Sequence, residues 1–330
     1  MTTTHATKYD SKRAPVLDRD CAITPPRTPT ATSTAAHKVL AEIQSIYNGL
    51  VKLNSLAPGP QINDLLSRLV DLCVLPYSTN LSEEILRLCA SSNLCERLRP
   101  ICAEAEGELE SYWAQRITAL AKVNPASKQT TTTNPLHSFP YHQNYIDLSH
   151  LECASLEPFL ASPPRNLAFI GSGPLPLTSL CVLDRYPTAT IHNIDRDLPA
   201  LQTSQQLCAR LGYTARSTFA CTDVSTDERS IIPGIQGQQM TDWHAFDVVF
   251  LAALVGVESH EKIAILESLV RKLRPGTVVV ARSARGLRTV LYPVLELGDE
   301  LEKAGFEILV EVHPWNKVVN SVIVLRVKER

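Results

Sequence analysis

Two glycines and two aspartates have the residue types and spacing of a nucleoside-binding site. Gly171 and Gly173 follow an apolar run that ends at Ile170, and a helical pattern begins soon after them. Glycine lacks a Cβ, so the backbone can turn sharply there and approach a ligand closely. Asp195 and Asp223 each follow a later apolar run, where a carboxylate can accept hydrogen bonds from ribose hydroxyls or an adenine amino group. These residues predict a binding site at the carboxyl edge of a parallel sheet.

Pro176 restricts the class of ligand that this site is expected to bind. A dinucleotide fingerprint would have a third glycine at this position, because close helix–strand packing beneath a pyrophosphate requires it. A Gly-x-Gly turn without that glycine better suits a ligand that has no pyrophosphate, such as S-adenosylmethionine. The alternatives are structural: a turn that needs small residues, Asp223 as a loop cap, and Asp197 as the cap of the next helix.

Alternating strand-like and helical segments supply the elements that must hold these residues. Continuous apolar strands separated by helices are typical of a parallel sheet covered on both faces. The last two strands are joined by a short loop, which permits an antiparallel hairpin but no parallel crossover. The sequence therefore predicts an α/β, Rossmann-like domain. Its expected strands are Asn166–Ile170, Thr188–Ile194, Ser217–Cys221, Phe246–Ala252, Thr277–Arg282, Phe306–Val312 and Ser321–Val327, and its expected helices are Leu175–Leu183, Pro199–Leu211, Glu258–Leu273 and Arg288–Ala304.

The residues before this domain have helical periodicity from about 37 to 123. We expect a first helix that ends before Pro58 and a second that begins near Ile62. The third should span Ser82–Cys89, with Ser82 at its start, and the fourth should span Glu96–Lys122. A Thr-rich loop at 127–134 then leads, through Phe139–Tyr145, into a short helix.

The chain divides into three parts by composition. Residues 1–35 are rich in Thr, Ser, Ala and Pro and have few large apolar groups, so we expect a disordered tail. Three aspartates within it argue against a transit peptide. We expect a helical lid or substrate domain at 36–160 and a Rossmann-like S-adenosylmethionine-binding domain at 161–330.

Charge and cysteine usage exclude several classes of protein. The net charge of −2 indicates no general attraction to nucleic acid or to an anionic membrane. The sequence has no apolar run long enough for a bilayer and no apolar signal-peptide core. The nine cysteines form no CxxC pair and have no nearby His partner for zinc. We therefore expect reduced, mostly buried thiols, no metal site, a cytoplasmic location and a small-molecule substrate, and we allow for a homodimer.

Several longer stretches resemble the nicotianamine synthase family. The similarity covers roughly residues 40–327, in the family's order. One family motif reads Arg-Ser-Ala-His-Gly and here has Arg285 in place of the histidine, so we assign no role to Arg285. The matching stretches are Glu104–Glu110, Phe139–Tyr145, Phe169–Thr178, Val249–Gly256, Arg282–Gly286, Leu291–Val294 and Val319–Val324.

This resemblance implies a class I S-adenosylmethionine-dependent transferase fold with an N-terminal helical domain. Members of the family condense three S-adenosylmethionine molecules into nicotianamine by 3-amino-3-carboxypropyl transfer and azetidine ring closure, and they release methylthioadenosine. S-adenosylmethionine is then the substrate, and neither a metal nor a nicotinamide is needed. Together with the strand-end pattern, the resemblance assigns the S-adenosylmethionine contacts to Gly171, Ser172, Gly173, Pro174, Asp195, Asp223, Ala252 and Leu254.

The implied transfer requires a neutral amine, whereas an α-amino group is largely protonated at neutral pH. A proton acceptor must therefore lie close to the nucleophile. Glu106 and Glu110 are four residues apart and so share one helix face, and either is a candidate base. Apolar neighbours on that helix could raise the pKa of a carboxylate there by desolvation. Tyr141 and Tyr145 have the same spacing and could orient the amine. The alternative is a solvated acidic face and two ordinary tyrosines.

Three further residues complete the predicted chamber. Arg282, just after the fifth strand, could pair with a substrate carboxylate, unless it forms a surface ion pair. Tyr292 and His313 are the other candidates for substrate contact. We expect the helical domain to cover the carboxyl edge of the α/β domain and so to bury the reaction chamber.

Two other functions stay open on the sequence. An ordinary S-adenosylmethionine-dependent N-methyltransferase would share the fold and the glycine turn. A non-catalytic interaction module of the same fold is the second, although such proteins usually lose the glycines and strand-end acids that are present here. A nicotinamide-dependent dehydrogenase is disfavoured by Pro176.

Overall fold

The computed structural model describes residues 31–122, 135–226, 241–256 and 258–329. Residues 1–30 of the predicted disordered tail and the predicted loop at 127–134 lie outside the described residues. The prediction of disorder is wrong for 31–35, which begin helix α1 (Ala31–Leu50), because an alanine-rich stretch favours a helix. Within the described ranges, no helix is both long enough and apolar enough to cross a membrane.

Seven strands within these ranges form one sheet, in the order β3-β2-β1-β4-β5-β7-β6. β1 to β5 pair in parallel, and β7 runs antiparallel to both β5 and β6. The predicted hairpin and the α/β, Rossmann-like class are therefore confirmed. The strands are β1 (Asn166–Ile170), β2 (Thr190–Asp195), β3 (Ser217–Cys221), β4 (Val248–Leu251), β5 (Val278–Ser283), β6 (Phe306–Val312) and β7 (Ser321–Val327).

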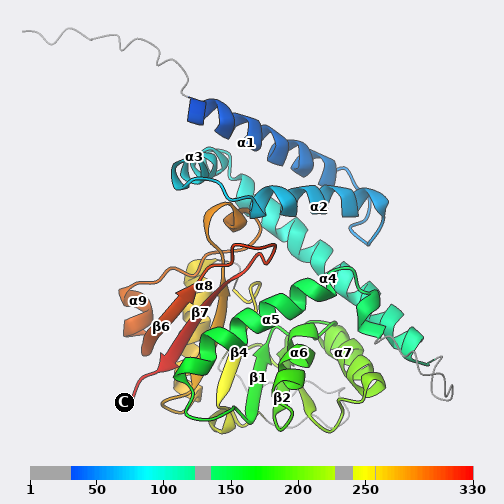
Figure 1. Cartoon of the computed structure of the whole chain (residues 1–330), viewed down its shortest axis with the longest axis vertical. Helices are drawn as coiled ribbons and strands as arrows, with labels where there is room; N and C mark the ends of the chain where they lie inside the picture. The colour runs from blue at the N-terminus through cyan, green and yellow to red at the C-terminus, as the bar shows by residue number, and fades with distance from the viewer. Residues whose placement is uncertain (1–30, 123–134, 227–240, 257, 330) are drawn as a thin grey trace, which may run out of the picture.

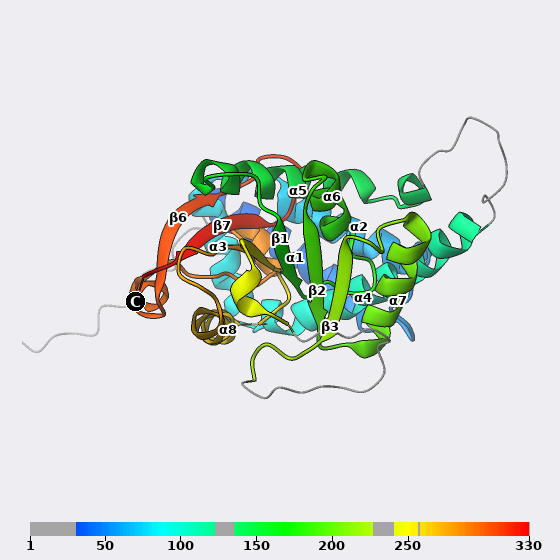
Figure 2. The same cartoon turned by 90° about the horizontal axis from the view of Figure 1, so that it is seen from below.

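Both faces of the sheet are apolar because side chains alternate along each buried strand. Val248 and Phe250 of β4 belong to the core on the side of α5 (His142–Leu156) and α6 (Leu177–Arg185). Val249 and Leu251 belong to the core on the side of α8 (Ser259–Lys272). Figure 2 shows α5 and α6 on one side of the sheet and α8 on the other. α7 (Leu198–Leu211) lies against β3, and the short α9 (Asp299–Lys303) lies against β6.

The N-terminal helices form a core of their own. α1, α2 (Pro60–Val74) and α3 (Thr79–Ala90) pack together with the first part of α4 (Leu94–Lys122), and Figure 1 shows them above the sheet. Ser78 Oγ caps α3 by accepting a hydrogen bond from Leu81 N. The prediction that Ser82 begins this helix is wrong, because Ser82 is buried inside α3.

Helix α4 connects the two halves of the molecule. Its first turns belong to the core of α1–α3. Its later residues Ala114 and Ile117 pack with α7 and β3. The segment between these two contacts carries Glu106 and Glu110 across the carboxyl edge of the sheet.

The structure corrects the predicted helix at Arg288–Ala304. A 3-10 helix, η4 (Gly286–Val290), and α9 are separated there by irregular chain that contains Pro293. Proline has no N–H to donate and disfavours the helical conformation of the residue before it, so Pro293 favours a break in the helix here. The short helix predicted to follow Phe139–Tyr145 is α5, which is longer than expected and already begins at His142. The remaining 3-10 helices in the described residues are η1 (Pro135–Ser138), η2 (Glu157–Phe159) and η3 (Trp243–Ala245).

The two halves exchange segments across their boundary. α5 precedes the sheet in sequence yet packs on it. Conversely, Leu287 and Val290 of η4 follow β5 yet pack into the core of α1–α3. Arg99 of α4 stabilises this contact, because its Nε and Nη2 donate hydrogen bonds to Thr289 O at 3.1 and 2.6 Å.

Candidate active site

A cavity with two compartments opens at the carboxyl edge of the sheet. The sheet-side compartment has a volume of about 590 Å³ and is lined by the β1–α6 loop, the ends of β2 and β3, and the segment after β4. The helix-side compartment has a volume of about 580 Å³ and lies between α2, α4 and Phe139–Tyr145. Eight of the residues that the structure describes line both compartments and are called the junction here: Ala103, Glu106, Glu110, Tyr145, Leu254, Arg282, Tyr292 and Asn320.

The glycine turn is built as predicted, but the two glycines meet side chains of the protein. Gly171 has φ +78°, and a Cβ added there would lie 2.4 Å from Val255 Cγ2. Gly173 has φ +61°, and a Cβ added there would lie 2.7 Å from Glu110 Oε2. The second glycine therefore lets the carboxylate of α4 reach the loop, a requirement that the sequence motif did not reveal.

The strand-end acids both line the sheet-side compartment. Asp195 Oδ2 accepts a hydrogen bond from Gly173 N at 2.8 Å, and its Oδ1 accepts one from Asp197 N at 3.0 Å. These bonds orient the carboxylate beside the glycine turn. Asp223 Oδ1 accepts from both N and Oγ of Ser225, so it caps its loop as well as facing the compartment. Asp197 caps α7 through Ala200 N, as its structural alternative predicted.

The structure brings Glu106 and Glu110 to the junction, each with a tyrosine as partner. Tyr145 Oη donates to Glu110 Oε1 at 2.8 Å, and Tyr292 Oη donates to Glu106 Oε2 at 2.9 Å. Burial raises the pKa of Glu106. Burial, joined by repulsion from Glu106, raises the pKa of Glu110 to about 8. The solvated acidic face is therefore excluded for these two residues.

The tyrosines divide into two kinds. Burial raises the pKa of Tyr145 and of Tyr292 well above its usual value, so both hydroxyls stay protonated and can donate. Tyr141 is 41% exposed, its ring packs on Phe139, and it lines the helix-side compartment only. Tyr145 and Tyr292 thus each lie beside a glutamate at the junction, whereas Tyr141, which was predicted with Tyr145 to orient the amine, does not line the junction.

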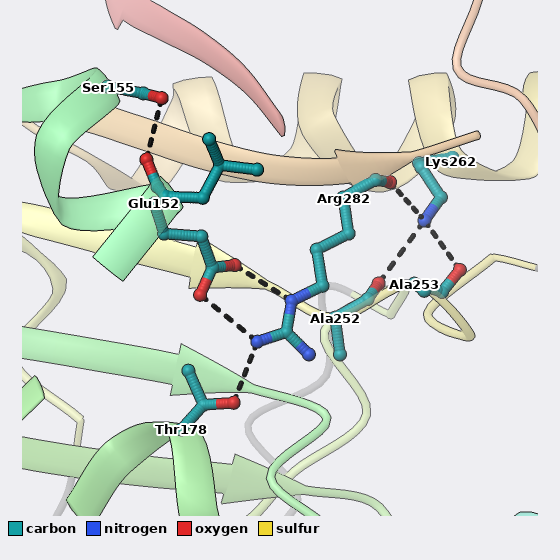
Figure 3. A network of polar contacts seen from close by, with 8 residues as sticks. Glu152, Ser155, Thr178, Ala252, Ala253, Lys262 and Arg282 are labelled. Carbon is teal, nitrogen blue, oxygen red and sulfur yellow. Dashed lines mark hydrogen bonds and ion pairs between the residues drawn. The ribbon is translucent and has the colours of Figure 1, made fainter. Parts of the chain in front are cut away.

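Arg282 already has a carboxylate partner inside the protein. Its Nε and Nη2 donate to the two oxygens of Glu152 at 2.8 and 3.1 Å, and Nη2 also donates to Thr178 Oγ1 at 2.7 Å (Figure 3). Arg282 is 8% exposed and Glu152 is fully buried. The predicted alternative of a surface ion pair is wrong, because this pair is buried. Glu152 was missed by the sequence reasoning, since only the tertiary structure brings α5 to β5.

Lys262 is a second residue that the sequence reasoning missed. It is fully buried in α8, and its Nζ donates to Ala253 O at 2.8 Å, Ala252 O at 3.2 Å and Arg282 O at 3.4 Å (Figure 3). Burial and the neighbouring Arg282 charge lower the pKa of Lys262 to about 7. Its position one turn before Leu266, on the apolar face of α8, was the available signal.

The other predicted site residues divide between the cavity and its surroundings. Ser172, Pro174, Ala252 and Leu254 line the sheet-side compartment. His313 lines neither compartment, and its Nδ1 shares a hydrogen bond with Ser321 Oγ at 2.8 Å. Arg285, the departure from the family motif, also lies outside both linings. Asn320, which carried no prediction, lies at the junction.

Sheet order, glycine turn and strand-end acids define a protein of the class I S-adenosylmethionine-dependent transferase fold. A crystal structure of MtNAS in complex with MTA and tNA superposes with a TM-score of 0.67, at 18% identity, over 92% of this chain and all of that one. A variant of MtNAS in complex with S-adenosylmethionine superposes with a TM-score of 0.65, at 20% identity, over 88% of this chain and 98% of that one. At these identities the likeness shows the shared fold.

Sequence comparison identifies the family. The model of the family described as "Nicotianamine synthase protein" matches residues 32–330. The chain is 38% identical to nicotianamine synthase 3 of Oryza sativa over 88% of its length and 78% of that protein. It is 36% identical to nicotianamine synthase 2 of Arabidopsis thaliana, over 87% of this chain and 83% of that one. This chain belongs to the nicotianamine synthase family.

Proposed function

We infer that this chain is a nicotianamine synthase. It condenses three S-adenosylmethionine molecules by 3-amino-3-carboxypropyl transfer and azetidine ring closure, and it releases methylthioadenosine. The observation that carries this function is the pair of partly buried glutamates, each with a raised pKa, at the junction of two compartments of nearly equal volume. One compartment suits a nucleoside, and the other leaves room for an amine acceptor beside it.

We propose that the sheet-side compartment binds the nucleoside part of S-adenosylmethionine. Asp195 is held beside the glycine turn by Gly173 N and would accept hydrogen bonds from the ribose hydroxyls. Asp223, at the end of β3, would accept from the adenine amino group. In that orientation the sulfonium lies toward the junction, where its positive charge favours the ionised form of the two glutamates.

Glu110 is the proposed base. The acceptor nitrogen, once neutral, donates its lone pair to the methylene carbon of the aminocarboxypropyl arm that is bonded to sulfur. The C–S bond breaks, its electron pair stays on sulfur, and neutral methylthioadenosine leaves. The proton that the acceptor's ammonium group loses to become neutral passes to the Glu110 carboxylate, whose pKa near 8 suits proton transfer close to neutral pH. The ammonium formed by the attack can keep its remaining proton.

The tyrosines and the second glutamate have supporting roles in this proposal. Tyr145 holds Glu110 Oε1 and leaves Oε2 toward the glycine turn. Glu106, held by Tyr292, raises the pKa of Glu110 by charge repulsion. Each of the three carbons bonded to a sulfonium can be attacked. The position of the acceptor nitrogen relative to the sulfonium therefore decides that the aminocarboxypropyl arm is transferred and not the methyl group. Two transfers between molecules extend the chain, and one within the product closes the ring.

The helix-side compartment is the proposed place for the growing acceptor chain. α1–α4 would form the lid over the carboxyl edge of the sheet. We therefore propose a boundary between two domains near residue 160, with α5 as an exception because it packs on the sheet. We also propose a cytoplasmic enzyme that binds neither nucleic acid nor a membrane. A homodimer stays a prediction, and light scattering of the purified protein tests it.

Product analysis with S-adenosylmethionine as the only substrate tests the function. We expect methylthioadenosine release without any acceptor, and mass spectrometry should detect nicotianamine. S-adenosylhomocysteine that forms only with an added amine would instead identify an N-methyltransferase. Failure to bind S-adenosylmethionine in a calorimetric titration would identify a non-catalytic module.

A further inference from the structure

Lys262 lies where a lysine is unfavourable on general grounds. It is fully buried near the N-terminus of α8, although lysine is almost never fully buried without a partner. The positive end of the helix dipole lies at the same terminus, so α8 itself does not stabilise the charge. An apolar side chain of similar length would avoid both problems. The lysine therefore depends on compensation from the groups around it.

Three carbonyl oxygens provide that compensation. Lys262 Nζ donates to Ala253 O, Ala252 O and Arg282 O (Figure 3). An ammonium group has three N–H donors and no acceptor, so the numbers of donors and acceptors match. The first two carbonyls directly follow β4, and the third belongs to β5. Lys262 therefore joins the ends of two neighbouring strands at the carboxyl edge of the sheet.

The chain that follows β4 bounds the predicted nucleoside site. Residues 252–256, called the wall segment here, line the sheet-side compartment along their whole length. Val255 packs on the glycine turn so closely that a Cβ added to Gly171 would lie 2.4 Å from Val255 Cγ2. Leu254 of the same segment lines the junction. The shape of the wall segment therefore sets the space beside the glycine turn.

Lys262 holds the wall segment from behind. Within the segment, Val255 N donates to Ala252 O at 3.3 Å, which closes a turn. Ala253 O lies inside this turn and accepts from Lys262 Nζ at 2.8 Å. The start of α8 is close to the end of the segment, because a Cβ added to Gly256 would lie 2.7 Å from Lys262 N. Loss of the ammonium would leave these carbonyls without their donor, and the segment would change shape to satisfy them.

We propose that Lys262 is a positioning residue for the nucleoside, because its ammonium group holds the wall segment in the shape that binds S-adenosylmethionine. Lys262 acts through residues 252–256 and does not contact the ligand itself, since it is fully buried. Methylthioadenosine has the same nucleoside, so its binding should depend on Lys262 to the same extent. This inference rests on the proposed function, since it presumes that the sheet-side compartment holds the nucleoside.

Calorimetric titrations with both ligands test this role. Lys262→Met keeps a side chain of similar length and removes all three donors. We expect S-adenosylmethionine and methylthioadenosine each to bind about 10-fold more weakly, the effect of about one lost hydrogen bond to the ligand. Titration at pH 6 keeps the wild-type residue in its ammonium form, because the pKa of Lys262 is about 7.

Steady-state kinetics separate positioning from a role in stability alone. KM for S-adenosylmethionine should rise by about the same factor as the dissociation constant. The value of kcat should change much less, because Glu106 and Glu110 are held by α4 and by their tyrosines. A lysine that only stabilised the fold would change the melting temperature and leave KM of the folded protein as it was.

Two further variants keep the test decisive. Lys262→Gln supplies two N–H donors, so it should lose less affinity than Lys262→Met, and it decides the question if the methionine variant does not fold. Lys303→Met, at an exposed position of α9, is the matched control and should bind both ligands normally.

Three results with folded Lys262 variants would overturn the proposal: unchanged binding of both ligands, weaker binding of S-adenosylmethionine alone, or a fall in kcat without a rise in KM. Wild-type protein that binds both ligands but releases no methylthioadenosine from S-adenosylmethionine would instead overturn the proposed function. The two failures are distinguishable, because the first is seen in the variants and the second in the wild type.

Discussion

Glu110 combines three features that a general base near neutral pH needs. Its carboxylate is partly buried, it lies close to a second carboxylate, and one oxygen accepts a hydrogen bond from Tyr145. Burial and repulsion raise its pKa, while the tyrosine opposes them only in part. The residue beside it on the glycine turn, Gly173, has no side chain to block the other oxygen.

Replacing Glu110 by glutamine tests the base directly. The amide has the same shape but cannot accept the proton, so methylthioadenosine release should fall about 10²- to 10⁴-fold. The variant should still fold and bind S-adenosylmethionine. Glu108→Gln, on the exposed face of the same helix, is the control and should keep its activity. Activity near that of the wild type in Glu110→Gln would remove the assignment.

The raised pKa of Glu110 also predicts how stability depends on pH. The folded state keeps the proton up to about pH 8, whereas the unfolded chain releases it near pH 4.5. The folded state therefore binds more protons in this window, and the free energy of unfolding should fall as pH rises through it. Urea unfolding at several pH values should show a steeper fall for the wild type than for Glu110→Gln. Parallel curves would contradict the raised pKa.

Gly107 leaves space open in the cavity, at a cost to the stability of α4. It lies within α4 and lines the sheet-side compartment, and a Cβ added there would meet nothing within 4 Å. Gly107→Ala should stabilise the helix by about 1 kcal/mol. The added methyl should also raise KM for S-adenosylmethionine, because it occupies space in the compartment. Thermal unfolding and initial rates measure the two effects, and an unchanged KM would show that this space is not used.

At the scale of elements, the buried pair of Arg282 and Glu152 joins β5 to α5, and Thr178 adds the start of α6. Neither partner is free to move toward solvent, so each depends on the other. Lys262 joins α8 to the chain ends of β4 and β5 in the same region. The wall of the junction is therefore fixed by contacts that join α5, α6, α8 and the ends of β4 and β5 (Figure 3).

Breaking the buried pair should cost far more than breaking an exposed one. Arg282→Met leaves the Glu152 carboxylate buried without a partner and should lower the free energy of unfolding by about 3–5 kcal/mol. Replacing Glu152 by leucine as well should recover much of this loss. Arg326→Met, which breaks a partly exposed pair with Glu307, should cost less than about 1 kcal/mol. Chemical denaturation measures all three, and equal losses for the two single variants would contradict this account.

At the scale of the whole molecule, the exchange of segments makes the two halves depend on each other. η4 belongs to the C-terminal half by sequence but to the helical core by packing. α5 has the opposite relation. The cavity lies between the halves and is lined by both, so its shape depends on this interlocking.

Leu287 provides a test of that dependence. It is 3% exposed and packs in the core of α1–α3. Leu287→Ala should destabilise the protein by about 2–5 kcal/mol, and amides of α1–α3 should lose hydrogen-exchange protection although the substitution lies far along the chain. Leu297→Ala, at a 37% exposed position, should have little effect. Loss of protection confined to the sheet would contradict the proposed coupling.

Local pattern predicted much of the fold and part of the site. β1, β3, β6 and β7 have the predicted bounds, because apolar runs bounded by turn residues mark a buried strand. The glycine turn and the spacing of Glu106 and Glu110 were equally readable, since both depend on residues near each other in sequence. The predicted start of a helix was wrong where more than one residue could act as its N-cap, as with Ser78 and Ser82 in α3.

The sequence by itself determined which residues share a strand end or a helix face, because the chain's own geometry sets those relations within a few residues. The tertiary structure alone decided which distant groups meet: Glu152 with Arg282, Tyr292 with Glu106, and Gly173 with Glu110. These contacts join residues far apart in the chain, and they follow from how buried surfaces pack in three dimensions. No spacing along the chain encodes them. They nevertheless set the charge and the shape of the site.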